Sequence, residues 1–224
     1  MDTAIPDLLQ SVSYFSELDR TIIDNIVQAL TPRTYTQGQI IQIEGQRAQG
    51  MYLIESGWVK AIKINPDGKE QILNILGPGE VFNTISVFNA GRAPATIEAL
   101  EETTTWSLPR ELFLALIERH PPLSQAVLHI LADRAQHLLG LVEDLSLRSV
   151  ESRLAHKLLE EAEEDTIHRK RWATQTEMAA HMGTVTDVLN RALRHMVEEE
   201  LIEVSREQIR ILDPQALKKR ALLE

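Results

Sequence analysis

The pattern of apolar and polar positions changes twice along the 224 residues. Residues 7–30 show the spacing of short amphipathic helices. From Tyr35 to about Leu108, short segments that alternate apolar with polar residues are separated by eight glycines. This is the spacing of strands and turns, and several strands of this length predict a small β-barrel or roll.

Helical periodicity begins at Pro109, which is well placed to start a helix. Pro121 and Pro122 then end that helix and start another. The second helix has an apolar residue at every third or fourth position, the spacing of a coiled-coil seam that pairs two subunits, although a helix packed on its own domain has the same pattern. The seam residues are Leu128, Leu131, Ala135, Leu138, Val142 and Leu145.

A break at residues 145–149 predicts a domain boundary and a hinge. Ser149 can cap a following helix that runs through Leu159. The polar stretch from Glu160 to Arg171 is interpreted as a linker to the last part of the chain.

Two short helices joined at a glycine follow this linker. Thr174 and Glu177 form a capping box that opens a helix over residues 175–182, and Gly183 ends it. Thr184 is interpreted as the cap of the next helix, which has a buried apolar side. Two helices around a tight glycine turn predict a helix-turn-helix.

The polar side chains of this motif are candidates for DNA contacts. Arg191 is the best candidate for guanine, because its guanidinium can form two parallel hydrogen bonds with that base. The full candidate set is Thr174, Gln175, Thr176, Thr184, Thr186, Asp187, Asn190, Arg191 and Arg194.

A β-hairpin is predicted after the second helix. Residues 201–204 and 208–212 alternate apolar with polar about the turn 205–207, and Asp213-Pro214 then opens a last helix. An ordinary helical hairpin would not require these strands. They indicate a winged helix-turn-helix.

The net charge of -10 is unexpected for a DNA-binding protein, but its distribution is uneven. Residues 165–224 hold ten basic and ten acidic side chains, so the remaining 13 basic and 23 acidic side chains leave the whole excess in residues 1–164. Basic residues cluster at 169–171, at 191 and 194, and at 218–220. A solvated surface without a nucleic-acid partner is the alternative explanation of this clustering.

Several classes of mechanism are excluded or disfavoured. The chain has no cysteine, which excludes disulfides, thiolate-held iron-sulfur clusters, cysteine zinc sites and thiol nucleophiles. It lacks the nucleophile elbow, the phosphate-binding glycine loop and the zinc-protease motif, so we expect no enzyme, no catalytic residues and no metal site. No apolar run is long enough to span a membrane and no signal peptide is evident, which predicts a cytoplasmic protein without a membrane partner.

At several motifs the chain resembles the superfamily of the cyclic-AMP receptor protein and the fumarate-nitrate regulator (CRP/FNR). The segments QGQII at 37–41, MYLIESG at 51–57 and LGPGEVF at 76–82 look like its β-roll framework, and MAAHMGTV at 178–185 and NRAL at 190–193 look like its recognition unit. The implied fold is α+β: a cyclic-nucleotide-binding-like β-roll, or double-stranded β-helix, at 1–121, a dimerisation helix at 122–147 and a winged helix-turn-helix at 148–224.

The resemblance implies a bacterial, homodimeric transcription regulator. Its second helix would enter the major groove of an approximately palindromic DNA site, and RNA polymerase is a further conceivable partner. The positions that read bases in the family correspond to Thr186, Asp187 and Arg191. Because the first of these is commonly arginine in the family, the DNA sequence recognised here is left open.

The resemblance also places an effector pocket in the roll, at Gly79, Glu80, Asn83, Thr84, Arg92, Ala93, Pro94, Ala95 and Thr96. Family members that bind cyclic nucleotides use a Gly-Glu pair for the ribose and an Arg-Ser or Arg-Thr pair for the phosphate. Asn83-Thr84 and Ala93-Pro94 stand at those positions, with Arg92 displaced by one residue. Cyclic AMP is therefore disfavoured as the effector.

Three alternatives follow. A regulator without an effector needs the fewest assumptions. A small-molecule or heme sensor stays open because an axial histidine suffices for heme, although no two of the seven histidines form a ligand pair with supporting context. The third is a protein-interaction module that has lost DNA binding.

Overall fold

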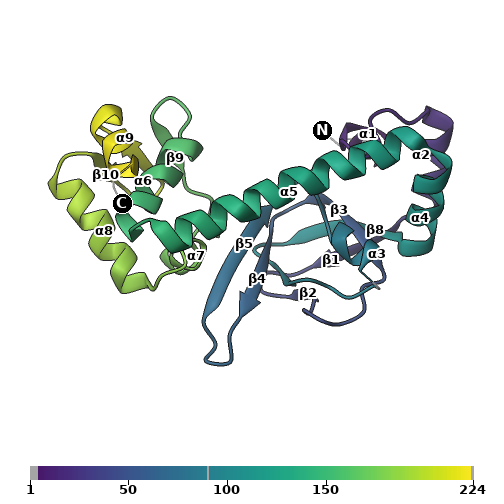
Figure 1. Ribbon diagram of the computed structural model, residues 1–224, viewed down its shortest axis with the longest axis horizontal. Helices are drawn as coiled ribbons and strands as arrows, with labels where there is room; N and C mark the ends of the chain where they lie inside the picture. Colours follow the sequence, from purple (N-terminus) through teal and green to yellow (C-terminus); the bar gives the residue numbers. More distant parts are fainter. Residues whose placement is uncertain (1–4, 90, 223–224) are drawn as a thin grey trace. The chain divides into compact units, whose positions relative to one another are not determined.

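The computed structural model describes residues 5–89 and 91–222 (Figure 1). Within the described residues the helices are α1 (Ile5–Ser11), α2 (Arg20–Ala29), α3 (Thr84–Phe88), α4 (Arg110–Arg119), α5 (Pro121–Leu147), α6 (Val150–Glu161), α7 (Gln175–His181), α8 (Thr186–Glu198) and α9 (Pro214–Leu222). The strands are β1 (Thr31–Tyr35), β2 (Ile40–Gln42), β3 (Gly50–Ser56), β4 (Val59–Ile64), β5 (Glu70–Leu76), β6 (Val81–Phe82), β7 (Thr96–Ala99), β8 (Thr103–Pro109), β9 (Thr166–His168), β10 (Ile202–Val204) and β11 (Gln208–Ile211).

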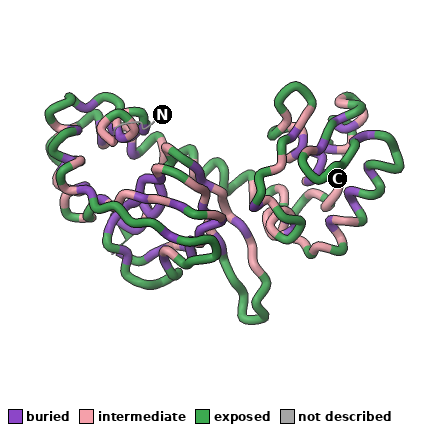
Figure 2. Tube along the Cα trace, turned by 180° about the vertical axis from the view of Figure 1, so that it is seen from behind, coloured by how far each residue is buried: buried purple, intermediate pink, exposed green. Residues whose placement is uncertain are grey.

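Contacts divide the chain into two compact units. The first contains the chain up to Lys63 together with Leu73–Gln136, and the second contains Ile64–Ile72 together with the chain from His137 onward. Each unit has its own buried core, as the burial colouring shows (Figure 2). The boundary falls within α5, so this helix contributes to both units.

The β-roll of the first unit is built from two four-stranded sheets, with strand orders β1-β8-β3-β6 and β2-β7-β4-β5. Apolar side chains from both sheets form one core cluster. Within it the rings of Tyr52 and Phe82 stack with their centroids 4.9 Å apart. The α+β fold predicted from the alternating segments is confirmed, with the roll followed by a long helix and a winged helix-turn-helix.

A second core in this unit joins the helices to the outer face of β3. Alternate β3 residues point to opposite faces of the sheet, so Met51 and Leu53 contact the helices while Tyr52 belongs to the roll interior. Phe15 and Phe113 pack edge to face, with ring centroids 6.1 Å apart, against this layer. The amphipathic helices expected within residues 7–30 are α1 and α2.

The long helix α5 is buried only near its start, at Leu123 and Val127. Among the predicted seam residues, Leu131 is half-buried and the other five are exposed. Leu128 and Val142 are 66% and 60% exposed. Most of its apolar seam therefore lies unpacked along this chain.

The second unit contains α6 to α9 and a three-stranded sheet of order β10-β11-β9. Ser149 caps α6 as predicted, since its hydroxyl accepts the backbone N–H of Ser152 at 3.1 Å. Asp213 accepts the N–H groups of residues 215 and 216 and so opens α9. The predicted wing corresponds to β10 and β11.

Two details of the sequence interpretation are wrong. The stretch from 160 to 171 is not only a linker, because it contains β9, which pairs with β11 through Ile167↔Ile209. Thr184 does not cap the second helix: α8 begins at Thr186, Val185 is its N-cap residue, and no side chain caps it. The backbone N–H of Thr184 instead bonds to the carbonyl of Ala179 at 2.9 Å and closes the turn.

No helix in the described part of the chain is long and apolar enough to cross a membrane.

Candidate DNA-binding surface and effector region

The turn between α7 and α8 depends on Gly183, which has φ +64°. A Cβ at this position would lie 2.3 Å from Leu145 Cδ2 and 2.7 Å from Gln71 Oε1, so there is no room for a side chain without movement of its neighbours. The amide of Gln71 also donates to the carbonyl of His181 at 3.4 Å. Neighbouring side chains therefore crowd the turn.

Helix α8 has sharply different faces. Leu189, Ala192, Leu193 and Met196 are buried against the core of the unit. At 3.6 residues per turn, Asp187, Asn190, Arg191 and Arg194 fall within an arc of roughly 100° on the opposite face. The sequence interpretation of an apolar side and a polar side is confirmed.

The polar face of α8 is available for contacts. Asp187, Arg191 and Arg194 are exposed, while Thr186 and Asn190 are half-buried. Within residues 5–89 and 91–222, the side chains of Arg191 and Arg194 make no hydrogen bond or ion pair. Their guanidinium donors are consequently free for a ligand outside the chain.

At the start of α7, Thr174 forms the predicted capping box. Its hydroxyl accepts the N–H of Glu177 at 3.2 Å and donates to the carboxylate of the same residue. Gln175 and Thr176 follow and are exposed. Thr174 thus has a structural role beside any contact with DNA.

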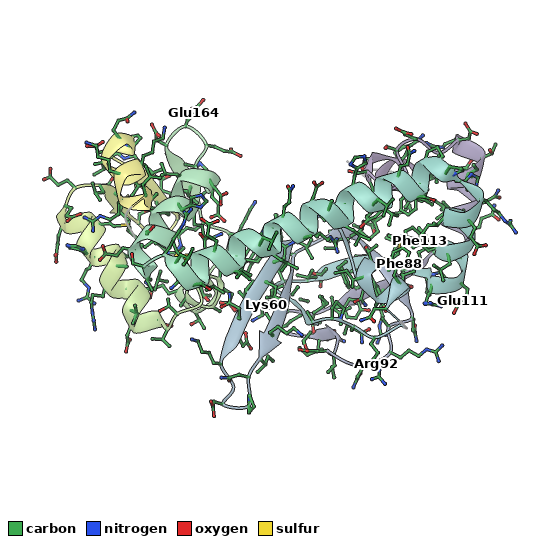
Figure 3. All side chains as sticks on the ribbon, viewed as in Figure 1. Lys60, Phe88, Arg92, Glu111, Phe113 and Glu164 are labelled. Atoms are coloured by element: carbon green, nitrogen blue, oxygen red, sulfur yellow. The ribbon has the colours of Figure 1, made fainter. Side chains whose placement is uncertain are left out.

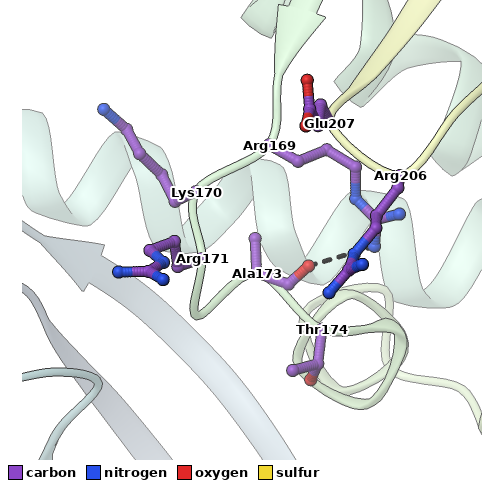
Figure 4. Close-up of a pocket in the computed structure, with 7 residues that line it drawn as sticks. All are labelled: Arg169, Lys170, Arg171, Ala173, Thr174, Arg206 and Glu207. Atoms are coloured by element: carbon purple, nitrogen blue, oxygen red, sulfur yellow. Dashed lines mark hydrogen bonds between the residues drawn. The ribbon is translucent and has the colours of Figure 1, made fainter.

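A basic pocket of about 470 Å³ lies next to this helix start (Figure 4). It is lined by Arg169, Lys170, Arg171, Ala173, Thr174, Arg206 and Glu207. Arg206 reaches it from the wing turn, and β9 brings the other basic residues there because the N–H of Arg169 bonds to the carbonyl of Glu207 at 2.8 Å. The guanidinium of Arg169 donates to the carbonyl of Ala173 at 3.1 Å.

The contribution of four basic residues to one pocket was missed from the sequence. The run at 169–171 was noted as a basic cluster, but the strand that pairs it with the wing was not predicted. One carboxylate, Glu207, lines the pocket together with four basic residues, so the lining carries an excess of positive charge. Such a site suits phosphate groups.

An ion network holds the end of α8 to its unit. His195 Nδ1 lies 2.8 Å from a Glu151 carboxylate oxygen, and Nε2 lies 3.4 Å from Glu199. Arg220 of α9 bonds to both carboxylates. The hydrogen bond to Glu151 and the two negative charges raise the pKa of His195.

In the roll, the residues at the expected ribose-binding position are engaged within the fold. Asn83 has φ +67° and precedes α3. Thr84 is fully buried, and its hydroxyl accepts the Tyr14 O–H at 3.1 Å. Burial raises the pKa of Tyr14, so that this phenol stays a donor. Among the described residues, Asn83 Nδ2 is buried without a hydrogen-bond partner.

The expected phosphate-binding position lacks a cationic fork. Ala93 and Ala95 are buried, and their neighbour Arg92 is exposed at the edge of the roll, where it donates to the Gly45 carbonyl at 3.1 Å (Figure 3). Pro94 is half-buried, and the hydroxyl of Thr96 accepts the N–H of Glu44 at 3.1 Å.

The two remaining pocket candidates shape a turn. Gly79 has φ +83°, and the carboxylate of Glu80 accepts the N–H of Gly77 at 2.7 Å. These contacts explain the LGPGEVF segment as a framework turn.

Comparison with known proteins identifies both parts of the chain. Residues 32–120 match the cyclic nucleotide-binding domain, and residues 152–220 match the Crp-like helix-turn-helix domain.

Relatives match over nearly the whole length. A cyclic AMP receptor protein from Thermus thermophilus is 30% identical over 81% of this chain and 84% of its own length. A CRP-like cAMP-activated global transcriptional regulator from Mycobacterium tuberculosis is 27% identical over 96% of this chain and 99% of its own. The solved structure of a CooA variant from Carboxydothermus hydrogenoformans has a TM-score of 0.77 at 21% identity, covering 99% of this chain and 97% of that one, and so shares the fold.

Proposed function

The chain belongs to the CRP/FNR superfamily and is a DNA-binding transcription regulator of that type, and we propose that it acts as a homodimer that reads an approximately palindromic DNA site without binding cyclic AMP. The observation that carries the DNA-reading part is the polar face of α8, whose exposed side chains have no partner within the described chain. The proposed site consists of Thr174, Gln175, Thr176, Thr184, Thr186, Asp187, Asn190, Arg191 and Arg194.

Arg191 is proposed to read a base. Its exposed guanidinium lies opposite the buried side of α8, so the helix can enter a major groove while its apolar face stays packed. The basic pocket at the wing is proposed to hold a backbone phosphate, which would fix the orientation of α8 but carry no sequence information. Base reading and phosphate binding thus fall to different residues.

Pairing of two subunits along α5 is supported by the exposed seam. Leu128, Leu138, Val142 and Leu145 are 66%, 41%, 60% and 38% exposed, although their spacing is that of a coiled-coil interface. Burying these side chains between two copies would remove apolar surface from water. Two α8 helices would then reach successive major grooves about 34 to 36 Å apart.

The absence of cyclic AMP binding is proposed from the side chains in the roll. A cyclic phosphate taken out of water requires charge-assisted donors, and Ala93 supplies none. Thr84 already accepts a hydrogen bond from Tyr14, and Arg92 donates to the backbone at the edge of the roll. The names of the two relatives refer to cyclic AMP, so this chain is expected to differ from them in its effector. A cytoplasmic location and a contact with RNA polymerase belong to the same proposal.

The test is DNA binding by the full chain, measured by fluorescence anisotropy on a duplex obtained by site selection and on a random duplex. We expect Arg191→Ala to cost about 1–3 kcal/mol on the selected site and much less on random DNA. Lys218→Ala, a charge change on the exposed side of α9, is the matched control and should leave both affinities nearly unchanged.

The outcomes separate the parts of the proposal. Equal losses on the two duplexes would make Arg191 a phosphate contact, and the absence of any salt-dependent affinity for DNA would favour the protein-interaction module. Calorimetry with cyclic AMP should show no binding; a measurable affinity would show that the interpretation of residues 83–96 is wrong.

A further inference from the structure

A second pocket in the C-terminal unit lies apart from the basic pocket at the wing. It has a volume of about 340 Å³ and is formed by the end of α5, one side of α6 and the end of α7. Its charged and titratable lining includes His137, Arg148, Arg153, Lys157, His181 and Asp144. We call it the hinge pocket, because the α5–α6 connection runs along it.

The three Lys and Arg side chains of the hinge pocket differ in the partners that they contact. Arg148 contacts the carboxylates of Glu143 and Asp144 at 3.3 and 3.2 Å. Lys157 pairs with Glu161. Arg153 differs from both: its Nε is buried and has no hydrogen-bond partner among the described residues. A buried guanidinium N–H without an acceptor is costly, so a ligand oxygen that accepted this hydrogen bond would be stabilised there.

The Lys, Arg, Asp and Glu side chains that line the hinge pocket balance in charge, because Glu143, Asp144 and Glu160 stand beside Arg148, Arg153 and Lys157. Burial lowers the pKa of Arg153, with Asp144 opposing the shift. Burial, aided by the charges of Lys157 and His137, lowers the pKa of His181 to about 3.

We propose that the hinge pocket binds a small organic oxyanion, either a phosphate monoester or a compact polycarboxylate, whose oxygens accept the unused donors of Arg153. The volume is at the lower end of the range for small-molecule sites, which favours a compact ligand. The site lies outside both the roll and the polar face of α8, so it goes beyond the proposed DNA-binding function.

A bound oxyanion would connect the α5–α6 hinge to the end of α7, next to the turn at Gly183. A ligand that prefers one arrangement of these helices shifts the population toward it and thereby alters the presentation of α8. This consequence rests on the proposed DNA-binding function, whereas the binding of the ligand does not.

The first experiment is isothermal titration of the full chain, without DNA, with glycerol 3-phosphate and with citrate, and with uncharged glycerol as the control. Glycerol 3-phosphate represents the phosphate monoesters, and citrate represents the compact polycarboxylates. We expect at least one to bind once per chain, and Arg153→Gln to weaken it roughly tenfold or more. No binding of either anion would overturn the proposal.

A second variant keeps the test valid if Arg153→Gln fails to fold. Gly140 lines the pocket, and a Cβ there would meet nothing within 4 Å. Gly140→Glu should fold, because glycine is a poor helix former, while its carboxylate repels an anion. We expect Gly140→Glu to abolish binding and Gly140→Ala to retain it; equal affinity of the two variants would contradict the proposal.

The basic pocket at the wing is the competing site. Arg206→Gln should leave anion binding within roughly twofold of the unmodified chain, as should Lys218→Gln. If Arg206→Gln removes binding and Arg153→Gln does not, the anion occupies the basic pocket and the proposal is wrong. DNA affinity is measured separately without anion, so loss of DNA binding alone would contradict only the proposed function.

Discussion

The helix-turn-helix and the α3 segment of the roll share a local backbone feature, but their polar side chains are exposed in the first and buried in the second. In each, a residue with positive φ leads toward a helix: Gly183 at +64° before α8 and Asn83 at +67° before α3. On the polar face of α8, Asp187, Arg191 and Arg194 are exposed and have no partner among the described residues. The polar side chains at the start of α3 are buried, and Thr84 is bonded to Tyr14.

This difference distinguishes polar side chains that are available to a ligand from polar side chains that stabilise the fold. An exposed guanidinium is hydrated until a ligand replaces the water, whereas a buried hydroxyl must find a partner inside the protein. The partner of Thr84 is Tyr14, which lies in the segment between α1 and α2, 70 residues earlier in the chain. The roll residues at the expected effector position thus stabilise the domain, and Asn83 Nδ2 is the atom that departs from this pattern.

The largest expected effect comes from the turn at Gly183. Gly183→Ala should destabilise the chain by about 2–4 kcal/mol, because the substitution adds left-handed strain of about 1–2 kcal/mol to a clash with Leu145. Gly79→Ala is the matched control, since its φ is also positive but a Cβ there has open space, and it should cost only the strain. Urea unfolding measures both. Equal losses would mean that the turn at Gly183 is not crowded.

The next largest effect comes from His181 in the helix-turn-helix, whose imidazole is half-buried and loses hydration in the fold. The pKa of His181 is lowered from 6.5 to about 3, so below pH 6.5 the unfolded chain binds a proton that the native chain does not. Stability should therefore fall as the pH drops from 6.5 toward 3, with a slope of up to about 1.4 kcal/mol per pH unit. Urea unfolding of the unmodified chain and of His181→Gln at several pH values tests this, because the variant should lose that slope.

The fold could be predicted from the sequence where a pattern is local. Alternation about glycines indicated the roll, and the spacing of apolar residues indicated α5 and α8. The strand β9 was missed because Ile167 is its only buried residue and its pairing partner, β11, begins 40 residues later. Thr184 was assigned as a cap because capping residues are common before helices, but the tight turn places it one residue too early.

The candidate site, like the fold, could be predicted only where its residues follow a local pattern. One face of α8 follows from helical periodicity, so Arg191 and Arg194 could be selected without a structure. The approach of Arg206 to residues 169–171 requires the β9–β11 pairing. The bond between Tyr14 and Thr84 depends on tertiary packing, for which no local pattern exists.

In the roll, the Tyr14–Thr84 hydrogen bond should contribute less to the free energy of unfolding than the two features above. Thr84→Val removes the acceptor of a buried phenol and should cost about 1–3 kcal/mol, while the double-mutant cycle with Tyr14→Phe should give a coupling of about 1 kcal/mol. DNA affinity should be unchanged in the folded variant. A loss of DNA affinity at unchanged stability would show that Thr84 is part of a signalling site, which would remove the contrast with α8.

The smallest expected effect lies on the exposed surface of the helix-turn-helix, where His195 is paired rather than free. The pKa of this histidine is raised above 6.5, first by its hydrogen bond to Glu151 and then by the charges of Glu151 and Glu199. Its stabilising contribution is therefore fully present below pH 6.5 and is lost as the pH rises through the raised pKa. This is opposite in sign to the effect of His181, although both belong to the same unit.

Two NMR titrations of the full chain can separate the two histidines. The imidazole of His195 should titrate above 6.5, and Glu151→Gln should move its pKa down toward that value; the resonance of His181 should not titrate between pH 5 and 8 in either protein. If Glu151→Gln leaves the pKa of His195 unchanged, the contact does not hold α8 in solution. A shift would show that some polar groups of α8 anchor the helix, while Arg191 and Arg194, on its other face, stay free for DNA.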